Sequence, residues 1–135
     1  ADLNQAMNDG TTPLYMASQE GHVDVVRCLA EAGADLNQAR GDGATPLYIA
    51  SEKGHMDVVR CLAEAGADLN QAMEGGATPL HMASYQGHLD VVKYLVEAGA
   101  DLNPGNYEGG TPLALALQES HKKVAAYLKR AGATA

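Results

Sequence analysis

Four histidines recur at a fixed interval and are the first residues in this sequence whose type and spacing could do chemistry. His22, His55, His88 and His121 are each separated by 33 residues. Imidazole is a common zinc ligand, and zinc requires its nitrogen ligands about 2.0–2.1 Å from a single ion. Equivalent positions on stacked helices lie about 8–10 Å apart, too far to share that ion. We therefore interpret the four histidines as structural residues at helix starts and predict no metal site.

The other chemically versatile side chains also favour structural roles. Asp2, Asp35, Asp68 and Asp101 each begin an Asp-Leu-Asn triplet, and aspartate in such turns accepts hydrogen bonds from nearby backbone N–H groups. His81 stands where the first two copies of its segment carry tyrosine, which favours packing or hydrogen bonding. We find no nucleophile elbow, phosphate-binding loop or dinucleotide fingerprint. The sequence therefore predicts no enzyme, with no catalytic residue and no cofactor.

The same 33-residue spacing governs the segments that would position these residues. The segment TPLYMASQEGH returns twice with few changes and once more altered, at residues 12–22, 45–55, 78–88 and 111–121. Its threonine can cap a helix that proline then begins, and its glycine can end that helix. A second helix is predicted from near His22, with Val25, Val26, Leu29 and Ala30 as its buried stripe. The stretch that follows, rich in Gly, Asn and Asp, is predicted to be a loop.

Helices this short are marginal alone and must stack. A 33-residue period of one turn and two helices resembles the ankyrin repeat, through DGTTPLYMASQEGH, VVRCLAEAGADLN and their copies over essentially the whole chain. The resemblance implies an all-α solenoid of stacked helix-turn-helix units with β-hairpin-like loops, whose concave face is lined by loop tips and first helices. We expect one domain, residues 1–135, with repeats at 1–33, 34–66, 67–99 and 100–132.

The two ends of the expected stack differ in polarity. The second helix of the fourth repeat carries Lys122, Lys123, Lys129 and Arg130, as a terminal cap requires. The second helix of the first repeat is as apolar as that of the second repeat, so nothing caps the N-terminal face. Either units were removed, or another molecule covers this face, or it is exposed. Because the chain starts at Ala1 without an initiator Met, we expect a piece excised or processed from a longer protein.

Two cysteines occupy equivalent places in neighbouring repeats. Cys28 and Cys61 are 33 residues apart, and a disulfide needs Cα atoms within about 7 Å, less than the spacing of stacked helices. We expect both thiols to be reduced and largely buried. Reduced thiols favour a reducing compartment, and therefore an intracellular location.

Charge and hydropathy limit the classes of partner that the chain can bind. The chain has 17 acidic and 9 basic side chains, a net charge of −8, which argues against nucleic acid. A field of this sign favours neutral or basic protein partners. No apolar run approaches the roughly 20 residues of a membrane span. We therefore expect a monomeric protein that binds neither nucleic acid nor membrane.

The first two repeats differ at seven positions, and five of the differences fall at the loop tip or at the end of the first helix. They are Met7/Arg40, Asn8/Gly41, Thr11/Ala44, Gln19/Glu52 and Glu20/Lys53. Because packing fixes core residues, we interpret all five as positions that face solvent or a partner. The third repeat varies at the same places.

These positions define the predicted binding surface. Its residues are Met7, Asn8, Asp9, Gln19, Glu20, Arg40, Asp42, Glu52, Lys53, Met73, Glu74, Tyr85, Gln86, Tyr107 and Glu108. Tyr and Met are enriched at interfaces, and the carboxylates make this surface acidic. We hypothesise a non-catalytic interaction module or scaffold that binds a protein through this surface. The alternative is a structural spacer, or an engineered repeat protein with no natural partner.

Overall fold

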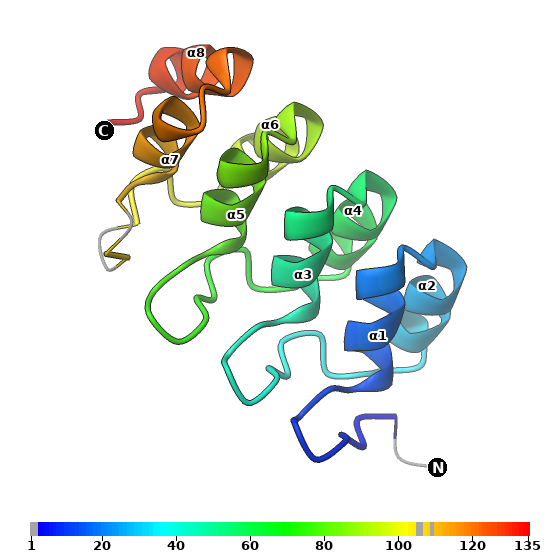
Figure 1. The fold of residues 1–135 in the computed structure, drawn as a ribbon. Helices are drawn as coiled ribbons and strands as arrows, with labels where there is room; N and C mark the ends of the chain where they lie inside the picture. The colour runs from blue at the N-terminus through cyan, green and yellow to red at the C-terminus, as the bar shows by residue number, and fades with distance from the viewer. Residues whose placement is uncertain (1–2, 105–106, 109) are drawn as a thin grey trace.

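The structure, a computed structural model, describes residues 3–104, 107–108 and 110–135 of the chain (Figure 1). The described residues form eight helices: α1 Pro13–Glu20, α2 Val23–Glu31, α3 Pro46–Lys53, α4 Met56–Glu64, α5 Pro79–Gln86, α6 Leu89–Glu97, α7 Pro112–Gln118 and α8 Lys122–Ala131. None of these described residues lies in a β-strand. The predicted all-α class is therefore confirmed.

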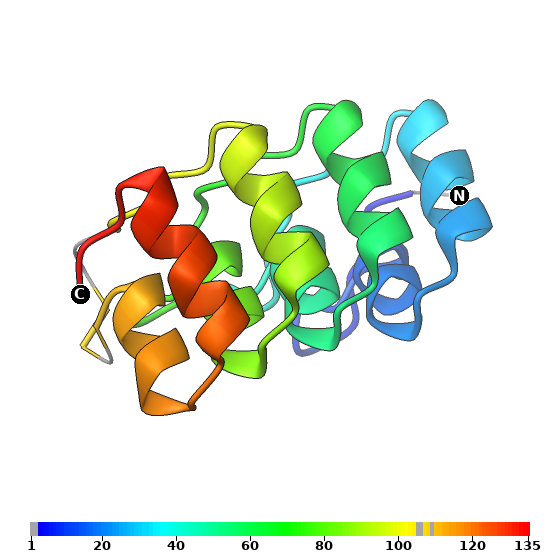
Figure 2. The ribbon, with the colours of Figure 1, turned by 90° about the horizontal axis from the view of Figure 1, so that it is seen from above.

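The helices lie in two rows. One row contains α1, α3, α5 and α7, and the other contains α2, α4, α6 and α8 (Figures 1 and 2). Neighbouring helices contact each other more extensively in the first row than in the second, so the stack curves toward the first row. We call each helix pair with its preceding loop a unit, numbered one to four. The first row faces the inner side of the curve, and the second row faces the outer side.

Each helix of the first row begins at a threonine–proline pair. Oγ1 of Thr12 accepts a hydrogen bond from the backbone N–H of Tyr15, over 3.1 Å, and the other three threonines cap their helices in the same way. This satisfies one of the N–H groups that a helix start leaves free. Helix α1 ends at Gly21 with φ +75°, a left-handed conformation that glycine adopts without strain. The predicted starts and stops are confirmed.

Aliphatic side chains from both rows fill one continuous core. In unit two, Leu47 and Ala50 from α3 meet Val59 and Leu62 from α4, and all four are almost completely buried. Full burial of one such large aliphatic side chain stabilises a fold by about 1.5–3 kcal/mol. Since isolated helices of eight or nine residues are marginal in water, packing between units holds them in place.

Asparagine side chains join each loop to the next. The backbone N–H of Asp35 donates to Oδ1 of Asn4 over 2.8 Å, and the same bond recurs at the next two unit boundaries. The carboxylate of Asp35 accepts in turn from the backbone N–H of Asn37. This local bond recurs in units three and four and confirms the predicted role of these aspartates; Asp2 lies outside the described residues.

The recurring histidines also join neighbouring units. His55 donates from Nε2 to the carbonyl oxygen of Gln19, over 3.0 Å. His88 and His121 make the same bond across the next two boundaries, over 2.9 and 2.8 Å. A ring nitrogen that faces a carbonyl oxygen must carry the proton, which fixes the tautomer. The predicted structural role is confirmed for these three residues.

Two burial predictions are wrong at the N-terminal end. Cys28 is exposed and Cys61 is half-buried, although both thiols are free as expected. Val25, expected in the buried stripe of its helix, is 49% exposed. Positions 25 and 28 face the preceding unit elsewhere in the stack, and unit one has no such neighbour in the structure. Cys61 does have a neighbour, but its side chain borders an open groove between α2 and α4.

Candidate functional site

The loop tips and the ends of the first-row helices form one surface on the inner side, which we call the inner surface. It comprises residues 7–9, 40–42, 73–75, 107–108, 19–20, 52–53, 85–86 and 118–119. All fifteen predicted binding residues lie on it and none is fully buried. The exposed ones are Met7, Asn8, Asp9, Glu20, Lys53, Glu74, Gln86 and Glu108. The half-buried ones are Gln19, Arg40, Asp42, Glu52, Met73, Tyr85 and Tyr107.

Backbone hydrogen bonds fix the loop tips. Within the first tip, the N–H of Met7 donates to the carbonyl of Thr11, and the N–H of Gly10 donates to that of Met7, both over 2.9 Å. Between tips, the N–H of Gly41 donates to the carbonyl of Asp9 over 2.8 Å, and the equivalent bond joins the second and third tips. The loops therefore present their side chains from a connected framework.

Two of the predicted binding carboxylates help to build this framework. Asp9 accepts from the backbone N–H of Thr11 over 2.9 Å, and Asp42 accepts from that of Ala44 over 3.0 Å. Hydrogen bonding by Thr11, through its side chain and its backbone N–H, holds the pKa of Asp9 below its ordinary value. These carboxylates therefore close their own turns and remain ionised at neutral pH.

Arg40 is held by its own loop and by the preceding unit. Its guanidinium lies 2.6 Å from Asp42 through Nη2 and Oδ2, with a second bond of 3.2 Å through Nε. It also stacks 5.0 Å from the centre of the Tyr15 ring, a cation–π geometry. The Arg40 side chain is the main cause that lowers the pKa of Asp42. Arg40 thus neutralises one acidic tip and covers the buried tyrosine below it.

The interpretation of position 11 as a surface position is wrong. Thr11 and its counterparts Ala44 and Ala77 are 5%, 1% and 3% exposed. Ala44 and Ala77 belong to the apolar cluster that includes Tyr48 and Ile49. The change from threonine to alanine between the first two units is therefore a packing difference.

A small apolar cluster lies beside the loop tips. Tyr48 and Ile49 are buried within it, and Met73, Met82 and Tyr107 pack on them from positions that stay partly exposed. Met82 was missed at the sequence level. The sequence did carry a signal, because Met82 occupies the same repeat position as Met16 and Ile49. The change from Met16 to Ile49 is one of the two apolar exchanges between the first two units.

His81 has both ring nitrogens engaged in the interior. The backbone N–H of Thr78 donates to its Nδ1 over 2.9 Å, so Nε2 carries the proton and lies 3.0 Å from the carbonyl oxygen of Gly110. The edge of the ring meets Tyr107, with ring centres 4.9 Å apart. Burial lowers the pKa of His81 below 6.5. The predicted packing and hydrogen-bonding role is confirmed.

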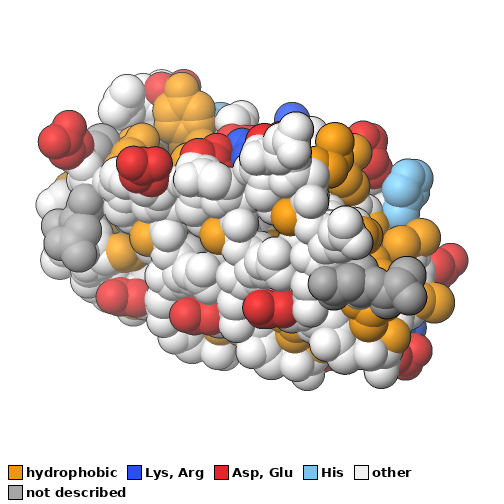
Figure 3. All heavy atoms as spheres, turned by 90° about the horizontal axis from the view of Figure 1, so that it is seen from below, with side chains coloured by type: hydrophobic (Ala, Val, Ile, Leu, Met, Phe, Trp, Pro, Cys, Tyr) orange, Lys and Arg blue, Asp and Glu red, His pale blue; other side chains and the backbone are white. Residues whose placement is uncertain are grey.

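Charge is unevenly divided between the two sides of the stack. The inner surface carries seven carboxylates and two cations, a net charge of −5 out of −8: Asp9, Glu20, Asp42, Glu52, Glu74, Glu108 and Glu119 against Arg40 and Lys53. Acidic side chains also recur along the loops, as Figure 3 shows. The other seven cations all belong to second-row helices: Arg27, Arg60, Lys93, Lys122, Lys123, Lys129 and Arg130.

Comparison with known families agrees with this architecture. A family model described as ankyrin repeats in three copies matches residues 1–73 and again residues 71–135. The chain belongs to the ankyrin repeat family. The resemblance seen in the sequence is thereby confirmed. A search of curated proteins found no match.

Ankyrin repeats are generally protein–protein interaction modules, and the family is typically non-enzymatic. No helix in the described part of this ankyrin chain has the length and apolar character needed to cross a membrane. Across the same described residues, no group of three or more His, Cys, Asp or Glu side chains is placed to hold a metal ion.

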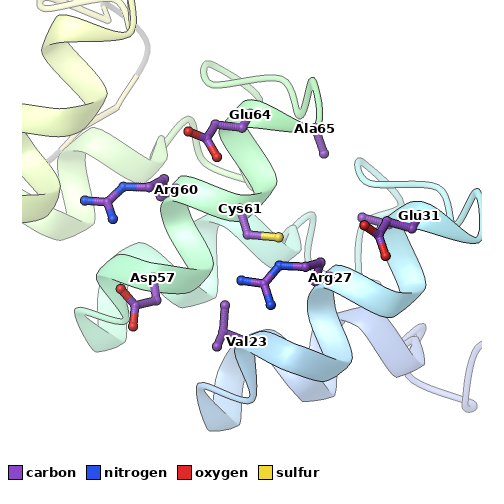
Figure 4. Close-up of a pocket in the computed structure, with 9 residues that line it drawn as sticks. Val23, Arg27, Glu31, Asp57, Arg60, Cys61, Glu64 and Ala65 are labelled. Carbon is purple, nitrogen blue, oxygen red and sulfur yellow. The ribbon is translucent and has the colours of Figure 1, made fainter.

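The ankyrin stack also has a groove on its outer side, between α2 and α4 (Figure 4). It has a volume of about 720 Å³, and its lining includes Arg27, Arg60 and the Cys61 side chain. Burial raises the pKa of the Cys61 thiol, which disfavours the reactive thiolate. The charges around the groove are mixed, since Asp57, Glu31 and Glu64 line it too. The groove therefore has neither a dominant charge nor a reactive thiolate.

Proposed function

We propose that this ankyrin repeat domain binds a protein partner on its inner surface, centred on units two and three. The observation that carries the proposal is the composition of that surface. Five of the eight net negative charges lie there, beside the partly exposed Met73, Tyr85 and Tyr107. Carboxylates around partly exposed aromatic and thioether side chains are suited to steer and then anchor a partner.

The fixed loop framework supports this proposal energetically. Hydrogen bonds between neighbouring loops, and from His55, His88 and His121 to the preceding unit, hold the surface before a partner arrives. Binding to a pre-organised surface loses little conformational entropy, so more of the contact energy is realised as affinity. The charged groups would set the association rate and its salt dependence.

The sign of the charge selects the class of partner. A net charge of −5 on the inner surface favours a protein that presents a neutral or basic segment, and it disfavours nucleic acid. This count already includes Arg40, whose positive charge offsets that of Asp42 in an ion pair. We further propose a monomeric domain of four repeats, bounded at residues 1–33, 34–66, 67–99 and 100–132, of which the last is a polar cap.

A display selection tests the proposed function. The intact chain is the bait, and the control bait carries Glu52→Lys and Glu74→Lys, two changes confined to the inner surface. Captured proteins that prefer the intact chain, and whose affinity falls as salt concentration rises, support the proposal. Reproducible absence of any partner for the intact chain favours a structural spacer. Partners that bind both baits equally would contradict the assignment to the inner surface.

A further inference from the structure

Arg40 fills a small cation site at the boundary between units one and two. Its guanidinium lies 5.0 Å from the centre of the buried Tyr15 ring and 2.6 Å from the carboxylate of Asp42. Aromatic rings and carboxylates are groups with which a guanidinium interacts well. The chain itself therefore shows how this surface holds an arginine side chain, with one aromatic ring from the neighbouring unit and one carboxylate from a loop tip.

The boundary between units two and three has a similar setting without a cation of its own. Met73 is the counterpart of Arg40. Together with Met82, it packs on the apolar cluster that contains the buried Tyr48. Both methionines stay partly exposed. Two flexible thioether side chains therefore form an apolar floor where unit two places an arginine.

Two carboxylates border this floor. Glu52 is half-buried and lies one helical turn after Tyr48 on α3, so both side chains project from the same side of the helix. Burial raises the pKa of Tyr48 and the carboxylate of Glu52 raises it further, as a negative charge close to the ring does. Glu74 follows Met73 in the third loop tip and is exposed. Within the described part of the chain, neither glutamate forms an ion pair.

Tyr107 supplies a reachable aromatic ring at this boundary. It comes from the loop of unit four, packs on the same apolar cluster and is half-buried. Contact with His81, with ring centres 4.9 Å apart, holds the ring in place. Aromatic, apolar and anionic groups thus meet on one stretch of the inner surface, and no cation of the described chain is paired with its two glutamates.

We propose that this boundary is a binding site for one arginine side chain of the protein partner, made of two thioether groups, one aromatic ring and two carboxylates: Met73, Met82, Tyr107, Glu52 and Glu74. The methylene stem of the arginine lies on the methionines. Its guanidinium stacks on the tyrosine ring and pairs with the carboxylates. A planar guanidinium suits this arrangement better than the compact ammonium of lysine. This inference rests on the proposed function, and it names the chemistry of the segment that the inner surface binds.

Unit one offers a matched internal control. Met7 and Met16 occupy the repeat positions of the two methionines of the site. They are 65% and 42% exposed, so any general attraction between guanidinium and thioether groups acts on them at least as strongly. Asn8 and Gly41 stand in the places of Glu74 and the aromatic ring. The control positions therefore have the apolar part of the site without its anionic and aromatic parts.

The test titrates the intact chain with N-acetylarginine methylamide and follows its methionine methyl groups by NMR. The matched probe is N-acetylcitrulline methylamide, which has nearly the same shape and no charge. The signals of Met73 and Met82 should shift with a dissociation constant on the order of 1–10 mM. The citrulline probe should bind at least about tenfold more weakly, because it lacks the charge that pairs with the carboxylates. The signals of Met7 and Met16 should not saturate over the same range of concentration.

Two variants at position 73, checked for folding by circular dichroism, complete the test. Met73→Arg fills the site with the chain's own arginine, as in unit two, and should abolish the response of Met82. Met73→Leu keeps the apolar floor and should preserve that response. The proposal is overturned by equal responses to the two probes, by no saturable shift at Met82, or by an unchanged response in folded Met73→Arg. A selected partner that needs Glu52 and Glu74 but no arginine would overturn this site and leave the proposed function standing.

Discussion

The imidazole ring of His55 packs directly on Gly21 of the preceding unit. A Cβ built on Gly21 would lie 2.9 Å from that ring, closer than a real Cβ contact. The same relationship joins Gly54 to His88 and Gly87 to His121, at 2.7 and 2.5 Å. The glycine therefore has two physical reasons to be there: a left-handed turn and room for the next unit's histidine.

We predict that Gly54→Ala is strongly destabilising and that His88 accounts for part of the loss. A non-glycine residue in the left-handed region costs roughly 1–2 kcal/mol, and overpacking costs a further ~1–3 kcal/mol. Urea unfolding of both single variants and of Gly54→Ala with His88→Ala measures the coupling. The loss in unfolding free energy of the double variant should be about 1 kcal/mol smaller than the sum of the losses of the two single variants. Additive losses would show that the ring does not restrict Gly54.

We predict that His81 weakens the fold as pH falls. Because burial lowers its pKa, folded His81 stays neutral at a pH where the unfolded chain takes up a proton, and stability declines as pH drops below 6.5. His81→Tyr, which restores the residue of the first two units, should reduce that decline. One proton corresponds to about 1.4 kcal/mol per pH unit.

The measurement is the free energy of unfolding from about pH 5 to pH 7.5, the range in which histidine ordinarily titrates. His22→Gln removes an exposed imidazole and is the control for losing one histidine. If His81→Tyr and His22→Gln change the pH dependence of the unfolding free energy to the same extent, burial of His81 is not the cause of that dependence.

We predict that Cys28 and Cys61 differ in reactivity although their local sequences match. Cys28 is exposed, whereas Cys61 is half-buried and burial raises its pKa. Thiol labelling of native Cys61→Ser should approach the rate of the unfolded chain, and labelling of native Cys28→Ser should be clearly slower. Equal rates for the two single-cysteine variants would contradict the burial difference.

The periodicity predicted most of the framework, because a 33-residue repeat fixes helix caps, core positions and loops at once. Thr12 and Gly21 have the predicted roles for this reason. Burial at Cys28 and Val25 was predicted wrongly because it depends on a neighbouring unit, and local sequence does not show whether one is present. The ion pair of Arg40 with Asp42 and the burial of Thr11 were also missed, since both arise from the conformation of the loop tip, which the repeat pattern does not specify.

We predict that unit one is the least protected against hydrogen exchange. A terminal repeat has one stabilising interface where an interior repeat has two, and local opening is easiest where fewest contacts hold the backbone. Amides of α2 should therefore exchange faster than those of α4 in native conditions. Equal protection of the two helices in a monomer, with the monomer established by sedimentation, would contradict this prediction.

The most direct test of the inner surface compares two half-buried tyrosines of unit three. Tyr85 lies on the inner side at the end of α5, and Tyr94 lies on the outer helix α6. With a partner from the display selection, Tyr85→Ala should raise the dissociation constant about 30-fold, the equivalent of ~2 kcal/mol. Tyr94→Ala and the outer charge reversal Arg60→Glu should each change it by less than about threefold. Both outer variants need a check of folding, because Arg60 lies 5.9 Å from the Tyr94 ring. If the dissociation constant is unchanged by Tyr85→Ala but rises strongly in a folded Arg60→Glu variant, the partner binds on the outer side. That result would contradict the account.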